Sequence, residues 1–236
     1  MELIPLKTKV LHSESDLLLV FQYALGQNNL SLKEEDIVII TSKAVSYAEG
    51  RLVDTDHLSV LVRNESDRVF GEGEMVMTLK NKMLIPNAGI DKSNAPEGKA
   101  ILWPKNPFQS ARDLCQSLKH QFGLTRLGVL ISDSNLHPLR RGTIGMAIGW
   151  AGFEGVQDER GNKDLFGKTL HYSQHAVADN LSSAAEPVMG NGDASIPFVL
   201  VRGSGVTFSD REFSAEDYFM DTNDCLYSNI MDLGEN

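Results

Sequence analysis

The sequence has only two cysteines, Cys115 and Cys225, and they are far apart in the chain. They form no Cys-x-x-Cys pair, so neither a disulfide framework nor a cysteine-based zinc site is predicted. This cysteine usage is typical of a reducing compartment, and we expect a cytoplasmic protein. No segment approaches the roughly 18 apolar residues that a membrane-spanning helix needs, and the first ten residues lack the apolar core of a signal peptide. We therefore expect no membrane partner.

Positive charge is also scarce, with 22 lysines and arginines against 32 acidic residues and a net charge of −10. Binding to nucleic acid of any sequence needs a cationic surface, so we expect no nucleic-acid partner. The P-loop, GxGxxG, HExxH and EF-hand motifs are absent. His171 and His175 are four residues apart and could bind a metal from one helical face, but two solvated helix histidines are the simpler interpretation.

The remaining composition is that of an ordinary globular protein, with 42% hydrophobic and 23% charged residues. A chain of 236 residues can bury a large core, and residues 1–236 are expected to form either a single domain or two intimately packed subdomains. Apolar runs and alternation predict strands at Leu3–Val10, Asp36–Ala44, Leu127–Ile131 and Phe198–Val201, and a hairpin of Met75–Leu79 with Met83–Ile85. Helical periodicity and capping residues predict helices from Ser13 to Gly26, from Ser110 to Gly123, over Gln174–Glu186 up to Pro187, and over Ala215–Leu233. Residues 51–73 are expected to form a short helix and loop, and Trp103–Pro107 a linker.

Two acidic turns carry the strongest chemical signal. Asp91 and Asp133 each follow an apolar strand, and Ser134 stands next to Asp133. Hard cations such as Mg²⁺ take oxygen ligands, typically one or two carboxylates completed by water and substrate phosphates. We therefore expect the two turns to share a metal and nucleotide site. The alternative is that each aspartate only caps a turn through its own side chain.

Cationic and hydroxyl side chains occur near these turns. Arg140 and Arg141 follow Asp133 closely and could clamp phosphate or carboxylate oxygens, although adjacent arginines are often only surface charge. Ser42 and Lys43 stand where a predicted strand opens into a loop, a usual place for ligand contacts. Polar capping of the strand end is the alternative for this pair.

Taken together, these segments resemble the coenzyme F420-0:γ-glutamyl ligase family. The matching segments occur in the family's order and cover most of the chain: TSKAVSYAEGR (41–51), NAGIDKSNAPEG (87–98), GVLISDSNLHPLRRGTIGMAIGWAG (128–152), NKDLFG (162–167), HAVADN (175–180) and MGNGDASIPFVLVRG (189–203). The resemblance implies an α+β fold with largely antiparallel sheets and flanking helices. It also implies a homodimer that uses GTP to add L-glutamate to F420-0 through a γ-glutamyl amide bond.

The resemblance further implies roles for individual residues. One or two Mg²⁺ or Mn²⁺ ions bridge the nucleotide phosphates; Asp91 and Asp133 correspond to ligands of the first ion, and Ser134 to a hydroxyl on the second. Ser42, Lys43 and Asn94 fall at nucleotide contacts. The family's glycine-rich nucleotide loop corresponds to Met189, Gly190, Asn191, Gly192, Asp193, Ala194, Ser195 and Ile196. The implied reaction passes through an acyl phosphate, with Arg140 or Arg141 assisting phosphoryl transfer.

The chain departs from the family pattern at three places. Tyr47 stands where the archaeal pattern has a lysine, and Asn191 stands where the family has a metal-binding glutamate, with Asp193 two residues later. The helical insert expected between residues 51 and 87 is short. These departures keep two alternatives open: a ligase whose acceptor is a folate such as tetrahydrofolate, and a nucleotide-binding protein that has lost catalysis. A plain structural or interaction protein is a third class, which the clustered polar turns disfavour.

Overall fold

The computed structural model describes residues 1–228 and centres on one five-stranded sheet in the order β1-β12-β2-β8-β9. Every neighbouring pair is antiparallel except β2 and β8, which are parallel. The strands are β1 (Glu2–Leu6), β12 (Phe198–Arg202), β2 (Asp36–Thr41), β8 (Leu127–Leu136) and β9 (Thr143–Ala151). The last strand of the chain therefore lies between the first two.

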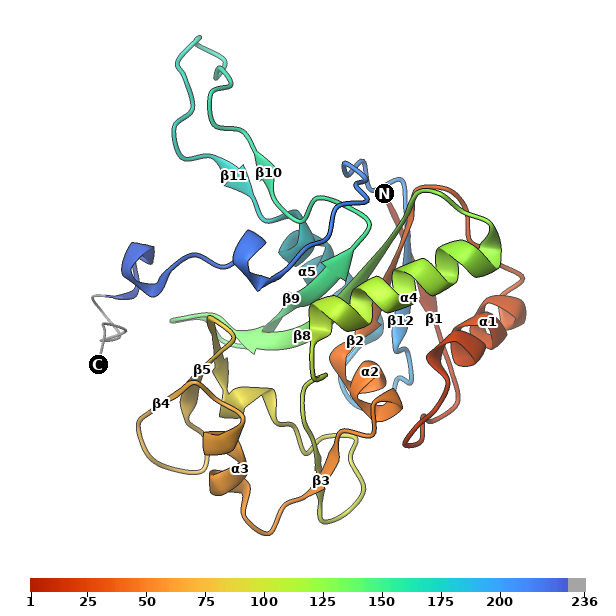
Figure 1. The fold of residues 1–236 in the computed structure, drawn as a ribbon, viewed down its shortest axis with the longest axis vertical. Helices are drawn as coiled ribbons and strands as arrows, with labels where there is room; N and C mark the ends of the chain where they lie inside the picture. Colours follow the sequence, from red (N-terminus) through yellow and green to blue (C-terminus); the bar gives the residue numbers. More distant parts are fainter. Residues whose placement is uncertain (229–236) are drawn as a thin grey trace.

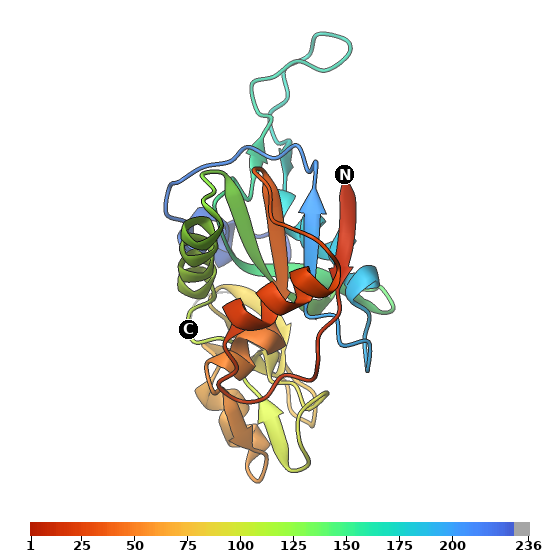
Figure 2. The same ribbon diagram turned by 90° about the vertical axis from the view of Figure 1, so that its right-hand side faces the viewer.

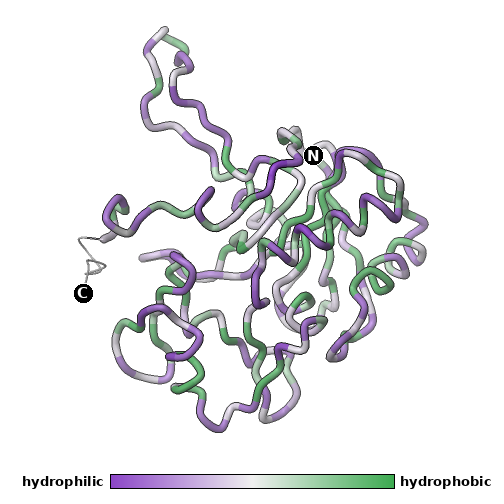
Figure 3. Tube along the Cα trace, viewed as in Figure 1, coloured by the Kyte–Doolittle hydropathy of each residue, from purple (hydrophilic) through white to green (hydrophobic). Residues whose placement is uncertain are grey.

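Helices cover both faces of this sheet (Figures 1 and 2). Successive residues of a strand point to opposite faces, so Val38 and Ile40 of β2 pack on one side and Ile37 and Ile39 on the other. The first side is covered by α1 (Leu17–Gln27), α2 (Ser42–Ala48) and α4 (Pro107–Phe122), and the second by α5 (Val177–Met189). The expected α+β fold with mainly antiparallel strands and flanking helices is confirmed. Figure 3 shows the apolar segments concentrated in this central region.

A smaller group of elements lies below the main sheet in Figure 1. The strand β3 (Leu52–Asp54) pairs with β7 (Lys99–Ile101), and α3 (Leu58–Asn64) leads to the three-stranded sheet of β4 (Arg68–Phe70), β5 (Met77–Lys80) and β6 (Met83–Pro86). A 3-10 turn, η1 (Asn87–Gly89), follows. The predicted hairpin is confirmed as β5 and β6. Met83 and Ile85 belong to the same buried cluster as residues of the main sheet, so the two groups share one core.

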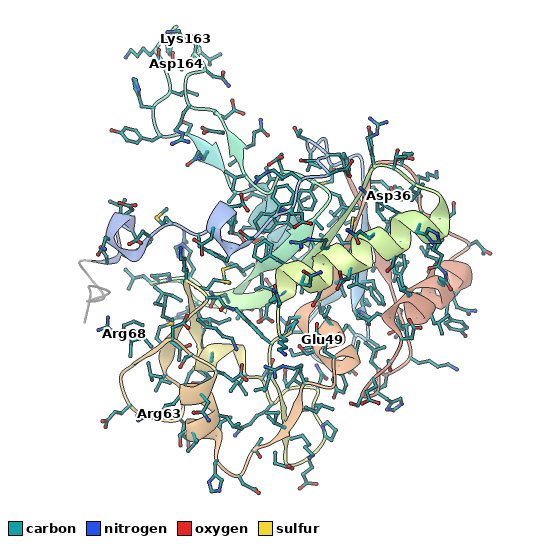
Figure 4. All side chains as sticks on the ribbon, viewed as in Figure 1. Asp36, Glu49, Arg63, Arg68, Lys163 and Asp164 are labelled. Atoms are coloured by element: carbon teal, nitrogen blue, oxygen red, sulfur yellow. The ribbon has the colours of Figure 1, made fainter. Side chains whose placement is uncertain are left out.

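A long arm, residues 156–176, projects from the body between β9 and α5 (Figures 1 and 2). Its base is the two-residue pair of β10 (Gln157–Asp158) with β11 (Gln174–His175), and Lys163 and Asp164 lie at its tip (Figure 4). The helix predicted over this segment is wrong at its start, because α5 begins only at Val177. His171 and His175 therefore do not share a helical face.

Two further helices begin at residues other than those predicted. The first begins after Asp16 rather than at Ser13, because the Asp16 carboxylate accepts the free N–H groups of Leu18 and Leu19, and it runs one residue past Gly26. The helix α4 begins at Pro107, three residues before Ser110, because Asn106 caps the N–H of Gln109 and Pro107 occupies the first helical position. Proline is favoured there because that position needs no N–H donor.

Other predicted boundaries also changed. The helix α5 continues through Pro187 to Met189, because a proline in the last turn removes only one bond of the ladder. The first strand ends at Leu6, and β2 ends at Thr41, where Ser42 begins α2. Residues 51–73 contain β3 and β4 besides the expected helix α3.

The predicted C-terminal helix is wrong over residues 215–227, which contain the 3-10 turns η2 (Ala215–Asp217) and η3 (Thr222–Asp224) and no α-helix. Ser228, the last described residue, is helical. A reciprocal cap between Ser214 and Asp217 satisfies the backbone of the first turn locally, without a longer helix. The rest of that prediction, residues 229–233, lies outside the described part of the chain. Within residues 1–228, no helix has the length and apolar character needed to cross a membrane.

Candidate functional site

The parallel strands β2 and β8 bring polar residues together at one edge of the main sheet. Thr41 at the end of β2 lies opposite Ser132 of β8. Beyond this pair, Ser42 begins α2, while β8 continues through Asp133 as a strand rather than opening into the expected loop. The strand β12 begins at the same edge, since the Pro197 carbonyl accepts the N–H of Thr41 at 3.0 Å.

Asp133 is held by two hydrogen bonds, one to each carboxylate oxygen. The Ser42 hydroxyl donates to Oδ1 at 2.9 Å, and the Trp103 indole N–H donates to Oδ2 at 2.5 Å. Burial raises the pKa of Asp133 above its ordinary value, although these donors and the nearby charge of Lys43 act in the opposite direction. A carboxylate has about four acceptor positions, so both oxygens can still bind a cation.

Asp91 is connected to this site through Lys43, the residue of α2 that follows Ser42. Lys43 Nζ is 2.7 Å from Oδ2 of Asp91. The Ser93 backbone N–H donates to Oδ1 at 2.6 Å, and the Ser93 hydroxyl donates to Oδ2 at 2.9 Å. Burial opposes ionisation of Asp91, but the bonds from Lys43 and Ser93 outweigh it and keep its pKa below the ordinary value. Asp91 does form the turn that the alternative interpretation described, and it forms an ion pair as well.

Consecutive residues of α2 therefore connect the two acidic segments. Ser42 binds Asp133 and Lys43 binds Asp91, so the structure brings these four predicted residues together. Tyr47, one turn further along α2, donates to the carbonyl of Asn94 at 2.8 Å. At the position where the family pattern has a lysine, this chain thus has a side chain that fixes the Asn87–Gly98 loop.

Trp103 is the residue of this site that the sequence did not reveal, because the segment was interpreted as a linker. The side chain is only 2% exposed. Its carbonyl accepts from Arg51 Nε at 3.0 Å, and Lys80 Nζ lies 5.6 Å from the ring centroid. The ring also packs so closely over Gly89 that a Cβ there would lie 2.2 Å from the indole nitrogen. The run Ile-Leu-Trp before Pro104 was the only signal of burial.

The glycine-rich loop of residues 189–196 reaches the same sheet edge. It leaves α5 at Gly190, and the Ser195 carbonyl accepts from the N–H of Thr8 at 2.9 Å. Pro197, directly after the loop, is bonded to Thr41. Asn191, Gly192 and Asp193 are exposed. In residues 1–228, no recorded hydrogen bond or ion pair joins this loop to Asp91 or Asp133.

Three other predicted residues are not brought against the carboxylates. Ser134 is the next residue of β8 after Asp133, and adjacent strand residues point to opposite faces; its backbone N–H nevertheless lowers the pKa of Asp133. Arg140 and Arg141 are exposed in the turn that joins β8 to β9. Their proposed contact with phosphate stays a prediction.

The donor set at this edge suits a hard cation better than zinc. Among the described residues, no group of three or more histidine, cysteine or acidic side chains is arranged to hold a metal. Two carboxylates, completed by phosphate oxygens and water, are the ordinary protein contribution to a Mg²⁺ site. Asp91 and Asp133 fit that requirement, provided that Lys43 leaves its ion pair with Asp91 and pairs with another anion.

Comparison with known proteins gives the same family over most of the chain. The family model described as F420-0:Gamma-glutamyl ligase matches residues 5–61 and 55–203. The chain is 34% identical to the coenzyme F420:L-glutamate ligase of Methanopyrus kandleri, with 86% of each protein covered. It is 33% identical to that of Methanocaldococcus jannaschii, covering 83% of this chain and 78% of the relative. The chain therefore belongs to the F420-0:γ-glutamyl ligase family.

Proposed function

We propose that this protein is a GTP-dependent ligase that adds L-glutamate to coenzyme F420-0 through a γ-glutamyl amide bond. The observation that carries the proposal is the placement of Asp91 and Asp133 around Ser42 and Lys43, at the edge where the glycine-rich loop ends. The relatives named as F420:L-glutamate ligases supply the acceptor and the amino acid.

The residues of the site have distinct tasks in this reaction. Asp91 and Asp133 would hold a Mg²⁺ or Mn²⁺ ion, and Ser134 and Asn191 would contribute oxygen ligands to a second ion where one is used. When bound, the cation neutralises charge on the phosphate oxygens. Ser42 and Trp103 fix the orientation of the Asp133 carboxylate. Lys43 leaves its ion pair with Asp91 and contacts the nucleotide phosphates instead.

The chemistry requires an activated acyl group because a free carboxylate is a poor acyl donor. An oxygen of the acceptor carboxylate attacks the γ-phosphorus of GTP, the bond from this phosphorus to the bridging oxygen breaks, and an acyl phosphate and GDP are formed. The α-amine of glutamate then attacks the acyl carbon, an amide bond forms and inorganic phosphate leaves. Water has to be excluded because an acyl phosphate hydrolyses readily.

A folate such as tetrahydrofolate is a second candidate acceptor, because it also presents a free carboxylate. Tyr47 and Asn191 replace charged residues of the family pattern, and Tyr47 is bonded to the Asn94 carbonyl instead of facing an anion. If Asn191 has removed catalysis altogether, the chain binds nucleotide without turnover.

The working unit that we propose is a homodimer, and the arm supports it. Leu165, Phe166 and Tyr172 on the arm are each at least 88% exposed, and such a concentration of apolar side chains marks an interaction surface. Replacing Phe166 by serine should lower the mass measured by light scattering from that of a dimer to that of a monomer. A monomeric wild type would refute this proposal.

The function is tested by measuring phosphate release together with the mass of the product. Reactions contain GTP or ATP, Mg²⁺ or Mn²⁺, L-glutamate, and either F420-0 or tetrahydrofolate. We expect turnover only when nucleotide, metal, glutamate and F420-0 are all present, with a product heavier by one glutamyl group. Turnover with tetrahydrofolate alone would establish the second candidate, and nucleotide binding without any amide product would refute both ligase functions.

Replacing Asp133 by asparagine tests the metal site. The substitution keeps the shape of the side chain but removes the negative charge, so we expect loss of metal-dependent GDP binding in calorimetry. Asp113→Asn, at an exposed position of α4, is the matched control and should bind normally. Unchanged metal-dependent affinity in Asp133→Asn would remove this residue from the site.

A further inference from the structure

A cavity of about 420 Å³ lies where α4 begins, on the β9 side of the candidate site. Its walls come from the β5–β6 turn, the start of α4, β9 and residues 214–219: Asp67, Asn81, Lys82, Met83, Trp103, Lys105, Asn106, Pro107, Phe108, Ile148, Ser214, Ala215, Glu216 and Phe219. The volume is in the range of sites for small molecules, about 300–1,000 Å³. No residue predicted to bind metal or nucleotide lines it.

Trp103 is the wall that this cavity shares with the carboxylate site. The indole N–H points to Asp133, and Trp103 is also one of the residues that line the cavity. Trp103 is itself fixed by Arg51, Lys80 and the close approach of Gly89. A ligand in the cavity therefore lies against a residue that also binds Asp133.

The lining combines an apolar floor with a polar rim. Met83, Phe108 and Ile148 are buried, and together with the ring of Trp103 they offer a surface for a flat conjugated ring. A dicarboxylic amino acid such as glutamate has only two methylene groups to place against this floor, so the floor does not suit it. The apolar part of the ligand is therefore an aromatic ring system.

The rim selects an anionic substituent on that ring. Lys105 is exposed, and no ion pair of its side chain is recorded within residues 1–228. Lys82 is paired with Glu216 at 2.6 Å, an exposed contact that a ligand anion can replace. Of the two acidic residues in the lining, Asp67 already accepts from the N–H of Asn81, and Glu216 is held by Lys82.

The glycine-rich loop lies on the other side of the carboxylates. Across the sheet edge the order is β12, β2, β8 and β9; the loop meets β12 and β2, Asp133 is on β8, and the cavity borders β9 through Ile148. A nucleotide on the loop and an aromatic ligand in the cavity can thus approach Asp91 and Asp133 from opposite sides without competing.

We propose that this cavity binds the ring of the acceptor whose carboxylate is activated, with Lys105 and Lys82 contacting its anionic groups. The inference rests on the proposed ligase function and gives the acceptor its own binding site. F420-0, a deazaflavin with a phosphodiester and a carboxylate, and tetrahydrofolate, a pterin with a carboxylate, share this chemistry, and so does a guanine nucleotide.

Calorimetric titration of the full chain with F420-0, with tetrahydrofolate and with GDP plus Mg²⁺ distinguishes these sources. Two variants change the cavity: Lys105→Glu reverses the charge at an exposed position, and Ala215→Trp fills the space. Lys33→Glu is the control, because Lys33 is exposed at the opposite end of β2. We expect each cavity variant to weaken binding of the acceptor by about tenfold or more and to leave GDP affinity unchanged, while the control binds normally.

Weaker GDP binding with unchanged acceptor affinity would assign the cavity to the nucleotide and overturn the proposal. Unchanged affinity for every ligand, or a wild type that binds neither acceptor, would overturn it as well. Because binding is measured without turnover, a wild type that makes the amide but shows no effect of the cavity variants refutes only the cavity. Acceptor binding that depends on Lys105, without any amide product, refutes only the proposed reaction.

Discussion

At the scale of single residues, the site depends on side chains that orient Asp133 as much as on Asp133 itself. A ligand carboxylate held by neighbouring donors keeps one orientation, and losing such a donor costs about 10–100-fold in metal affinity or activity. Ser42 and Trp103 provide these donors here, one to each oxygen.

Replacing Trp103 by phenylalanine should weaken Mn²⁺-dependent GDP binding by about 10–100-fold, because it removes the N–H and keeps an aromatic ring. The measurement is the Mn²⁺ concentration that supports half-maximal GDP binding. Trp150→Phe is the matched control, since the buried Nε1 of Trp150 has no hydrogen-bond partner in the described structure. Equal Mn²⁺ requirements in the two variants would show that Trp103 does not position the carboxylate.

The sequence predicted the residues with distinctive chemistry but not Trp103, which holds one of them in place. Asp91, Asp133, Ser42 and Lys43 were named because carboxylates, hydroxyls and cations after strands suggest ligands. Trp103 was missed because its role depends on contacts with residues 30 positions or more away along the chain, Arg51 and Asp133. Pattern within a short segment carries no information on such partners.

At the scale of elements, two glycines of β9 set the distance between the sheet and its helices. A Cβ on Gly145 would lie 2.3 Å from the Ser182 carbonyl oxygen of α5, and one on Gly149 would lie 2.5 Å from the backbone of Pro107 at the start of α4. Both obstacles are main-chain atoms, which cannot turn aside as a side chain can. The strand β9 can therefore pack this closely against α5 and α4 only because residues 145 and 149 have no side chain.

Gly149→Ala should lower the free energy of unfolding by about 1–3 kcal/mol, the usual cost of overpacking a core. Gly26→Ala is the opposite case, because it lies in α1 with nothing within 4 Å of the added Cβ. There we expect a gain of up to about 1 kcal/mol from better helix propensity. Urea unfolding checks both through the transition midpoint, and a stable Gly149→Ala protein would contradict the close packing.

Element boundaries were less predictable than element types for a similar reason. The apolar run of β8 ends at Ile131, yet the strand continues to Leu136 because β9 pairs with the polar residues Ser132 to Asn135. The strand β9 follows β8 closely in the sequence, but the hydrophobic alternation of β8 alone does not reveal that β9 pairs with these polar residues. The start of α4 was missed because Asn106 and Pro107 were interpreted as part of a linker.

At the scale of the whole molecule, a partly buried cluster of charged side chains joins the smaller sheets to the core. Glu65, after α3, is bonded to Lys80 of β5 at 2.7 Å and to Arg51 at 3.0 Å. Arg51 in turn reaches the Trp103 carbonyl, and Lys80 lies over its ring.

Replacing Glu65 by glutamine should lower the free energy of unfolding at neutral pH by about 1–3 kcal/mol, because it leaves Lys80 buried without its counter-ion. Burial opposes ionisation of Glu65, but Lys80 and Arg51 outweigh it and hold its pKa below the ordinary value of 4.5. The folded protein thus binds this proton less readily than the unfolded chain. The stabilisation is complete above about pH 4.5 and is lost as the pH falls through the folded pKa.

Urea unfolding from neutral pH down to about pH 3 measures this difference. The gap between wild type and Glu65→Gln should narrow as the pH falls below 4.5. Glu35→Gln is the control, because Glu35 forms an exposed pair with Arg126, for which a contribution of about 0–1 kcal/mol is usual. A gap that widens on acidification would contradict the ion-pair assignment.

The overall architecture was predictable mainly through the family resemblance, since the quoted motifs identified the fold more firmly than periodicity did. The arm could not be predicted, because residues 155–167 are mainly polar and turn-forming, and nothing in that composition indicates projection from the body. The 3-10 turns near the C-terminus were missed because the spacing of apolar residues does not show that caps such as that of Ser214 and Asp217 satisfy the backbone of a single turn.

The order of strands in the main sheet has a consequence for synthesis. The strand β1 pairs with β12, a strand near the other end of the sequence, with Glu2 opposite Arg202 and Leu6 opposite Phe198. While the ribosome makes the intervening residues, β1 has no strand to pair with, and β2 lacks its neighbour on the side where β12 will pair. Both strands therefore have unpaired edges during this time. Contacts this distant in sequence slow folding, and unpaired strand edges invite association between chains. The central sheet can therefore be completed only after β12 has been made and has entered between β1 and β2.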